Sequence, residues 1–289
     1  MRMLYSIVPQ RILGVIPARY GSSRFPGKAL APIAGKTMLQ HVWERASQAR
    51  YLSSLVIATD DERIRQAALE FSARVVMTRS DHVSGTDRVA EVASASNAGI
   101  VVNIQGDEPM IDPSAIDAAI LHLLENPEAP MATLKTRIED PDEVSDPNIV
   151  KVVCDSRGTA LYFSRLPIPS GTGAAHFTQH FKHLGLYVYQ RDFLLAYPDL
   201  PVGPLESAER LEQLRALENG FKIQVAETEF DSIGVDTPED LQRISDLWSN
   251  SRTTDSPGAA KSAEFLSRLT PRSAGCALFE MEGLASNHG

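Results

Sequence analysis

The chain has very little cysteine, and where the two cysteines lie excludes two common kinds of structural support. Cys154 and Cys276 are the only cysteines in 289 residues, and neither belongs to a Cys-x-x-Cys or histidine-rich motif. The sequence therefore indicates neither a disulfide framework nor a zinc site, and a reducing, cytoplasmic compartment is expected.

Long hydrophobic runs and an excess of positive charge are also missing. No stretch approaches the roughly 18 consecutive apolar residues of a membrane span, and the start, MRMLYSIVPQR, has too short an apolar core for a signal peptide. The formal net charge is −9, whereas nucleic-acid binding depends on clustered Lys and Arg. With 43% apolar residues the chain can bury one sizeable core. We expect a globular protein with neither a membrane span nor a nucleic-acid partner.

The first half of the chain alternates predicted strands and helices. Short apolar runs predict strands, and apolar residues at helical spacing behind capping residues predict helices. The predicted strands are residues 12–16, 55–58, 74–77 and 100–104, and the helices are 37–50, 64–71, 86–93 and 113–125. This pattern is typical of a doubly wound, mostly parallel (Rossmann-like) α/β sheet, in which ligands bind beyond the carboxyl ends of the strands.

From Met131 the pattern changes to strand-like runs, which predict a smaller inserted β-rich part at about 131–220 within one domain of residues 12–249. Its expected elements are strands 131–136, 150–153, 160–163 and 182–189, a hairpin turn at 155–158, and helices 191–197 and 206–218. A strand at 221–225 and a helix at 238–248 complete the domain. Residues 1–11 are predicted to be disordered, 170–175 to form a flexible loop, and 250–289 to form a linker and flexible tail.

A loop rich in glycine and cations follows the first predicted strand, in the sequence ILGVIPARYGSSRFPGK. Glycines let backbone N–H groups approach phosphate oxygens, while Arg offers forked donors and Lys a point charge to the same anion. The spacing fits neither the Walker loop nor G-x-G-x-x-G. Taken alone, the segment is either a polyphosphate-binding loop or a solvated basic turn. The cations are Arg19, Arg24 and Lys28, and the glycines are Gly21 and Gly27.

Two aspartates lie at predicted strand ends far apart in the chain. Asp107 belongs to V-N-I-Q-G-D-E-P and Asp236 to G-V-D-T-P-E-D. Each could be only a turn or capping residue. If both reach the same edge of the sheet, they would suit Mg²⁺, which usually takes one or two carboxylates with substrate phosphates and water.

Together the motifs resemble those of the 3-deoxy-manno-octulosonate (Kdo) cytidylyltransferases, a family of sugar-activating nucleotidyltransferases. They run in order from about residue 12 to residue 244. They are P-A-R-Y-G-S-S-R, T-R-S-D-H-V-S-G-T-D-R, N-I-Q-G-D-E-P, Y-F-S-R, H-L-G-L-Y, L-E-Q-L-R and G-V-D-T-P-E-D. The loop at 170–179 and the tail after about residue 250 have no counterpart that we recognise.

The resemblance implies a cytoplasmic enzyme that converts CTP and Kdo to CMP-Kdo and diphosphate for lipopolysaccharide synthesis. It also implies Mg²⁺ as cofactor and a homodimer formed through strands of the second half. Whether the product serves lipopolysaccharide or a capsule, and how many Mg²⁺ ions act, is left open by the residues.

The resemblance further implies a role for individual residues. The catalytic residues are Arg19, Lys28, Asp107 and Asp236, of which the two aspartates bind the metal. The nucleotide-binding residues are Ala18, Arg19, Gly21, Ser22, Lys28, Thr78, Arg79, Ser84, Gly85, Thr86 and Gln105. The sugar-binding residues are Arg165, His183, Tyr187, Glu212 and Gln213. On spacing alone, Tyr187 could instead be a core residue and Glu212 an exposed helical residue.

Two other functions compete with this one. The chain could activate another acidic sugar, such as 8-amino-Kdo or a sialic acid. It could also be a non-catalytic nucleotide-binding module on the same sheet, since fold does not fix function. Paired carboxylates beside Arg19 and Lys28 favour an enzyme, because a binding module has no need for them.

Overall fold

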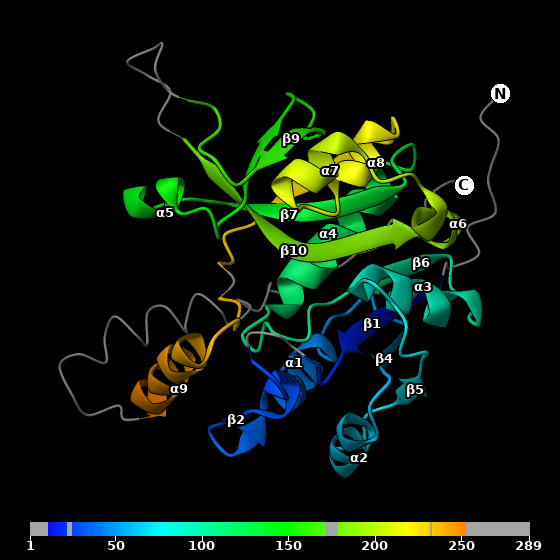
Figure 1. Cartoon of the computed structure of the whole chain (residues 1–289), viewed down its shortest axis with the longest axis vertical. Helices are drawn as coiled ribbons and strands as arrows, with labels where there is room; N and C mark the ends of the chain where they lie inside the picture. Colours follow the sequence, from blue (N-terminus) through cyan, green and yellow to red (C-terminus); the bar gives the residue numbers. More distant parts are fainter. Residues whose placement is uncertain (1–10, 22–24, 171–178, 232, 253–289) are drawn as a thin grey trace, which may run out of the picture.

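A nine-stranded sheet forms the centre of the computed structural model, which describes residues 11–21, 25–170, 179–231 and 233–252 (Figure 1). In chain order its strands are β1 (Ile12–Ala18), β4 (Ser54–Thr59), β5 (Val75–Met77), β6 (Ile100–Asn103), β7 (Met131–Arg137), β8 (Lys151–Cys154), β9 (Ala160–Ser164), β10 (Phe181–Gln190) and β11 (Ile223–Glu227). They lie side by side in the order β11-β7-β10-β6-β1-β4-β5, and β8, paired with β9, joins β10. A separate ribbon contains β2 (Pro32–Ile33) and β3 (Lys36–Thr37).

In the order β11-β7-β10-β6-β1-β4-β5, four of the six neighbouring pairs are parallel, as the sequence predicts, whereas β8 pairs antiparallel with both β9 and β10. β1 is parallel to both β4 and β6, and β7 is parallel to β11. β10 runs antiparallel between β6 and β7 and joins the two halves into one sheet. The β-rich second half therefore extends the same sheet, and the α/β nucleotidyltransferase fold expected from the sequence is confirmed.

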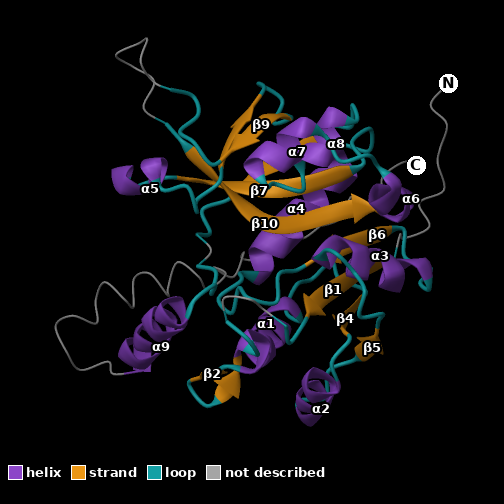
Figure 2. Cartoon of the chain, in the orientation of Figure 1, coloured by secondary structure: helices purple, strands orange, loops and turns teal. Residues whose placement is uncertain are grey.

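Helices cover both faces of the sheet (Figure 2). They are α1 (Met38–Ala46), α2 (Glu62–Glu70), α3 (Gly85–Ser94), α4 (Pro113–Glu125), α5 (Pro141–Ser145), α6 (Arg191–Ala196), α7 (Pro204–Glu209), α8 (Leu214–Glu218) and α9 (Pro238–Arg252), with 3-10 turns η1 (Lys28–Leu30) and η2 (Tyr197–Asp199). Apolar residues of α1 and α4 pack on one face and those of α3, α6 and α8 on the other. No helix among the described residues has both the length and the apolar character needed to cross a membrane.

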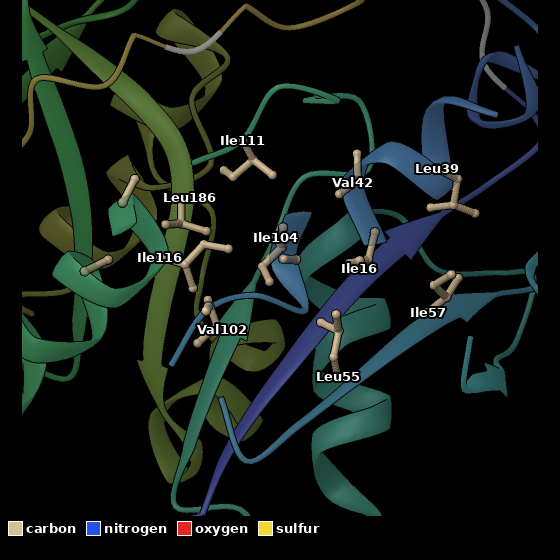
Figure 3. Close-up of a cluster of buried hydrophobic side chains, with 14 of the residues drawn as sticks. Ile16, Leu39, Val42, Leu55, Ile57, Val102, Ile104, Ile111, Ile116 and Leu186 are labelled. Atoms are coloured by element: carbon tan, nitrogen blue, oxygen red, sulfur yellow. The ribbon is translucent and has the colours of Figure 1, made fainter. Parts of the chain in front are cut away.

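The hydrophobic core between the sheet and helices α1 and α4 contains side chains from β1, β4 and the end of β6. Figure 3 shows Ile16 of β1, Ile57 of β4 and Ile104 just after β6 among side chains from α1 and α4. All three isoleucines are fully buried. Burying such a side chain contributes about 1.5–3 kcal/mol, so the strand ends that carry polar residues are anchored in a rigid layer.

Capping residues begin several helices where the sequence predicts them. The Thr37 side chain accepts a hydrogen bond from the Gln40 amide at the start of α1. Asp61 caps α2 in the same way. Ser84 and Asp87 form a reciprocal capping box at α3, so α3 begins at Gly85, one residue before the expected start.

The single helix predicted over residues 206–218 is wrong. Arg210 adopts the left-handed conformation (φ 55°, ψ 46°) and separates α7 from α8. Tertiary contacts fix the chain there, because the Glu209 carboxylate accepts from the Arg165 amide at 2.9 Å and the Arg165 Nε donates to the Glu209 carbonyl at 2.8 Å. The break leaves Gln213 buried, a position that a continuous amphipathic helix would not have predicted.

Other boundaries differ by a few residues. α1 ends at Ala46 rather than Arg50, since the Arg50 amide and guanidinium are both bound by the Asp117 carboxylate. α9 continues to Arg252, beyond the expected end at Trp248. The short helix α5 and the β2–β3 ribbon were not predicted. The predictions for residues 1–10, Ser22, 171–178 and 253–289 lie outside the described residues.

Candidate active site

A cleft of about 310 Å³ opens at the carboxyl ends of β1 and β6, the edge where the fold class predicts a ligand. Residues from five separate segments line it. They are Pro17, Ala18 and Arg19 after β1; Lys28, Ala29 and Met38; His82, Val83, Ser84, Gly85 and Arg88; Gln105, Gly106 and Asp107 after β6; and Asp236 before α9. All four predicted catalytic residues are therefore brought together.

Lys28 lies between the two predicted metal-binding aspartates. Its Nζ is 2.6 Å from Asp107 Oδ2 and 3.1 Å from Asp236 Oδ1, and it also donates to the Val235 carbonyl at 3.0 Å. The Lys28 side chain is 18% exposed, against 31% for Asp107 and 50% for Asp236, so the cation is the innermost of the three groups. Burial lowers the pKa of Lys28, but the two carboxylates outweigh it and the net shift is upward. The ammonium is therefore firmly charged.

Backbone contacts deliver Asp236 to this position. The Val235 amide donates to the Asp107 carbonyl at 2.9 Å, which ties the segment before α9 to the end of β6. The Asp240 carboxylate accepts from the amides of Asp236 and Thr237 at 3.0 and 2.9 Å, and Thr237 Oγ1 accepts from the Asp240 amide. This reciprocal cap confirms the predicted helix start and fixes the backbone at Asp236.

Two glycines permit the close approaches on which the cleft depends. Gly27 has φ 73°, a left-handed conformation that glycine adopts without strain, and it directs the chain into η1 at Lys28. At Gly106, an added Cβ would lie 2.9 Å from the Pro17 carbonyl oxygen. Only glycine lets the turn after β6 cross so close to the end of β1.

The donor set of the cleft suits Mg²⁺. Asp107 and Asp236 come from segments far apart in the chain and both contact the Lys28 ammonium. Both offer hard carboxylate oxygens. Among the described residues, no cluster of three or more His, Cys, Asp or Glu side chains could hold a metal ion. Two carboxylates completed by phosphate oxygens and water are the usual magnesium arrangement, so these residues fit that ion.

Part of the predicted nucleotide-binding motif at residues 78–88 forms one wall of the cleft. Ser84 and Gly85 line it at the start of α3, while Thr86 is buried behind them. Thr78 and Arg79 are not among the lining residues: Thr78 accepts from the Arg88 guanidinium, and the exposed Arg79 pairs with Asp81 at 2.9 Å. Gly21 is exposed and also lies outside the lining.

Glu212 contacts this wall, and Gln213 follows Glu212 in the chain. Ser84 Oγ donates to Glu212 Oε1 at 3.3 Å, and Thr86 also hydrogen-bonds the Glu212 carboxyl. Burial raises the pKa of Glu212, although those hydrogen bonds act in the opposite direction. Gln213 is buried, and its Nε2 has no hydrogen-bond partner among the described protein atoms. The structure thus joins predicted sugar-binding residues to the predicted nucleotide wall.

His183 and Tyr187 lie together on β10 at a bulge between Leu184 and Tyr187, where the pairing with β7 shifts. Their ring centroids are 5.4 Å apart. His183 Nε2 is 3.0 Å from Thr133 Oγ1, and burial lowers the pKa of His183 to about 3. The bulge also exposes the Gly185 carbonyl, which accepts from Gln105 Nε2 at 3.1 Å and so links β10 to the cleft.

Comparison with known proteins places this site in a family. The family profile described as cytidylyltransferase matches residues 13–223. The chain belongs to the cytidylyltransferase family. A 3-deoxy-manno-octulosonate cytidylyltransferase of Solibacter usitatus (strain Ellin6076) is 68% identical over 241 residues, which cover 83% of this chain and 96% of the relative. The protein of the same name from Geobacter sulfurreducens is 55% identical over 243 residues, covering 81% and 97%.

A solved structure supports the same assignment. It is a CMP:2-keto-3-deoxy-manno-octonic acid synthetase complexed with CTP, with 45% sequence identity and a TM-score of 0.79. The match covers 83% of this chain and 98% of that one. The chain is therefore a nucleotidyltransferase of the 3-deoxy-manno-octulosonate cytidylyltransferase family, as its motifs predicted.

None of the five predicted sugar-binding residues of this cytidylyltransferase is among the residues that line the cleft, and Arg165 is bound elsewhere. The Arg165 guanidinium donates to the carbonyls of Glu209 at 2.8 Å, Pro147 at 2.9 Å and Arg210 at 3.5 Å. These contacts fasten the end of β9 to the break between α7 and α8. A sugar carboxylate would have to displace or share them.

Sequence reasoning left other lining residues without a role. They are Pro17, Ala29, Met38, His82, Val83, Arg88 and Gly106. Arg88 is only 4% exposed and contacts Thr78, at the other end of the same quoted motif, and Asp60 after β4; neither contact has a periodic signal in the sequence. His82 lies within a quoted motif, and its loop position was the available signal.

Proposed function

We propose that this chain transfers a cytidylyl group from CTP to 3-deoxy-D-manno-octulosonate, giving CMP-Kdo and diphosphate. The observation that carries the proposal is the meeting of Lys28, Asp107 and Asp236 in one cleft at the carboxyl edge of the sheet. The relatives that bear this enzyme name match over nearly their whole length, which supports the substrate pair.

The reaction is an in-line displacement at phosphorus. The anomeric 2-hydroxyl of the sugar attacks the α-phosphorus of CTP, and diphosphate leaves on the opposite side. Such a transfer requires positioning and neutralisation of charge rather than a covalent intermediate. Arg19 and Lys28 hold the triphosphate. Asp107 and Asp236 would hold Mg²⁺, which would supply neutralisation of the phosphate charge during the transfer.

The two substrates meet where α3 begins. Ser84 and Gly85 face the nucleotide, and Glu212 contacts the same Ser84 from the other side. Burial keeps His183 neutral above about pH 3, so its imidazole can exchange hydrogen bonds with sugar hydroxyls without adding charge. Tyr187 beside it retains its proton, because burial raises its pKa.

The same proposal includes magnesium as cofactor, a homodimer, a cytoplasmic location and a role in lipopolysaccharide synthesis. Family membership supports these points, and the two cleft carboxylates support magnesium in particular.

The test is diphosphate release from CTP and Mg²⁺, with Kdo, 8-amino-Kdo, sialic acid and no sugar compared side by side. Release with Kdo alone is the expected result. Release with a different acid would retain the mechanism and change the substrate. No release with any acid, while CTP still binds, would favour a non-catalytic nucleotide-binding module.

A further inference from the structure

One wall of the cleft is held from behind by α3. Arg88 and Glu91 are three residues apart, so both side chains project from the same face of this helix. Arg88 donates to the Thr78 hydroxyl. Glu91 contacts the Arg79 amide and the His82 ring, which follow Thr78 in the chain. The exposed chain between β5 and α3 is thereby fastened to a packed helix.

Glu91 makes both of its contacts through one oxygen. Glu91 Oε2 accepts from the Arg79 amide at 3.1 Å and is hydrogen-bonded to His82 Nε2. The His82 side chain is 8% exposed, although it lines the cleft, whereas Glu91 is 34% exposed and is not among the lining residues. His82 therefore lines the cleft, and Glu91 holds the His82 side chain in place from outside the lining.

The neighbouring residues depend on the same helix. Ser84 is fixed by its capping box with Asp87, and His82 by Glu91, so Val83 is held between two anchored positions. Val83 lines the cleft and is 89% exposed. Residues of α3 therefore hold both ends of the segment 82–84 that forms this wall.

We propose that Glu91 is a positioning residue for CTP: it holds His82, and with it residues 82–84, in the conformation that receives the nucleotide. The inference deepens the proposed function, since it takes CTP as the ligand of the cleft. Glu91 acts through His82 without touching the nucleotide. A preformed wall stabilises the bound substrate and the transition state alike, so its loss raises KM and leaves kcat nearly unchanged.

The experiment compares Glu91→Ala and Glu91→Gln with the wild type in two measurements. One is the Kd of Mg²⁺-CTP without sugar, by calorimetry, and the other is the kcat and KM for each substrate. Glu91→Ala should weaken CTP binding about tenfold, the effect of losing hydrogen bonds to a charged acceptor. Glu91→Gln should recover most of that loss, because its amide oxygen still accepts. The KM for the sugar should stay within about twofold.

The sign of the effect separates positioning from simple electrostatics. Both variants remove a negative charge, which by itself would strengthen binding of an anionic nucleotide. Glu125→Gln, at the exposed end of α4, makes the same charge change outside the cleft and should leave CTP binding unchanged. Tighter CTP binding by Glu91→Ala, or an unchanged Kd, would overturn the proposal.

A double-mutant cycle tests whether Glu91 acts through His82. If it does, Glu91→Ala combined with His82→Ala binds CTP no more weakly than His82→Ala alone. Fully additive losses would overturn the inference, as would a lowered melting temperature with normal CTP affinity, which marks a structural role. A wild type that binds CTP but activates no sugar would overturn the proposed function alone. A wild type that binds no CTP would overturn both.

Discussion

The Lys28 ammonium lies 2.6 Å from the Asp107 carboxylate although 79 residues separate them in the chain. The same nitrogen is 3.1 Å from the carboxylate of Asp236, which lies 208 residues after Lys28 in the chain. One cation therefore lies between the two carboxylates that fit magnesium. In the proposed reaction, lysine and metal would compete for the same negative charge, and the triphosphate would offer the lysine another partner.

Replacing Lys28 by Met should strengthen divalent-metal binding to the protein without nucleotide. The variant removes a positive charge within hydrogen-bonding distance of both carboxylates, and charges at such distances interact by about 1–4 kcal/mol near a protein surface. We expect Mn²⁺ affinity, measured by the loss of the free-ion EPR signal, to rise at least about tenfold. Diphosphate release should nevertheless collapse, since in the proposed mechanism Lys28 holds the triphosphate.

Lys36→Met is the matched control for that experiment. Lys36 pairs with Glu44 at 2.5 Å on the surface, with 42% and 39% of their side chains exposed. Its loss should leave Mn²⁺ binding unchanged. Equal Mn²⁺ affinity in Lys28→Met and the wild type would show that the lysine does not compete with the metal.

Asp107→Asn should abolish turnover and leave the fold intact. The amide keeps the shape of the side chain but loses the charge that pairs with Lys28 and that we propose holds magnesium, and loss of one such electrostatic group costs at least about a hundredfold in kcat. The melting temperature should stay within about 3 °C, because Asp107 is partly exposed. Near-normal diphosphate release would refute the metal assignment.

Asp117→Asn provides the contrasting case. Asp117 is buried, accepts from the amides of Arg50 and Tyr51, and is not among the residues that line the cleft. This variant should lose stability in thermal unfolding while keeping its kcat at low temperature.

Asp240→Ala should weaken catalysis without removing any group from the cleft. Asp240 accepts from the amides of Asp236 and Thr237, and loss of such a cap costs about 1 kcal/mol of stability. With the backbone at Asp236 loosened, we expect a higher half-saturating Mg²⁺ concentration and a kcat lowered about tenfold. Glu239→Gln, on the same turn but exposed, should behave like the wild type. Unchanged magnesium dependence in Asp240→Ala would contradict this role.

The sequence was sufficient for the fold because its local signals agree with one another. Pro113 starts α4 and Glu125 ends it, as predicted, since the proline and the apolar spacing mark the same boundaries. The helix predicted over residues 206–218 failed for a non-local reason: Arg165, 44 residues before Glu209, fastens the chain where the helix would continue. Contacts of that kind leave no periodic trace.

The site residues divide in the same way, into those that local sequence signals predict and those that depend on contacts between distant residues. Lys28, Asp107 and Asp236 could be predicted because each ends a strand or loop at one edge of the sheet. Arg88 and Glu91 could not, since their partners lie in a loop whose path only the fold defines. The sugar-binding role of Arg165 stays a prediction, and nothing in the sequence indicates that its donors bind three backbone carbonyls.

Stability should fall as His183 becomes protonated in the unfolded chain. Burial lowers the pKa of His183 to about 3 in the folded protein, whereas an unfolded histidine titrates near 6.5. Above 6.5 both states are neutral and the residue adds no pH dependence. Between 6.5 and about 3 only the unfolded state takes up the proton, so the folded state loses about 2 kcal/mol by pH 5 relative to pH 8.

The variant His183→Asn lacks this pH-dependent contribution to stability. In urea unfolding the variant should be less stable than the wild type at pH 8, where it loses the Thr133 contact, and should gain about 2 kcal/mol on it by pH 5. NMR of the His183 ring should show a neutral imidazole down to about pH 4. A stability difference that stays constant from pH 8 to pH 5 would mean that His183 titrates normally and that its imidazole is charged when the acidic sugar binds.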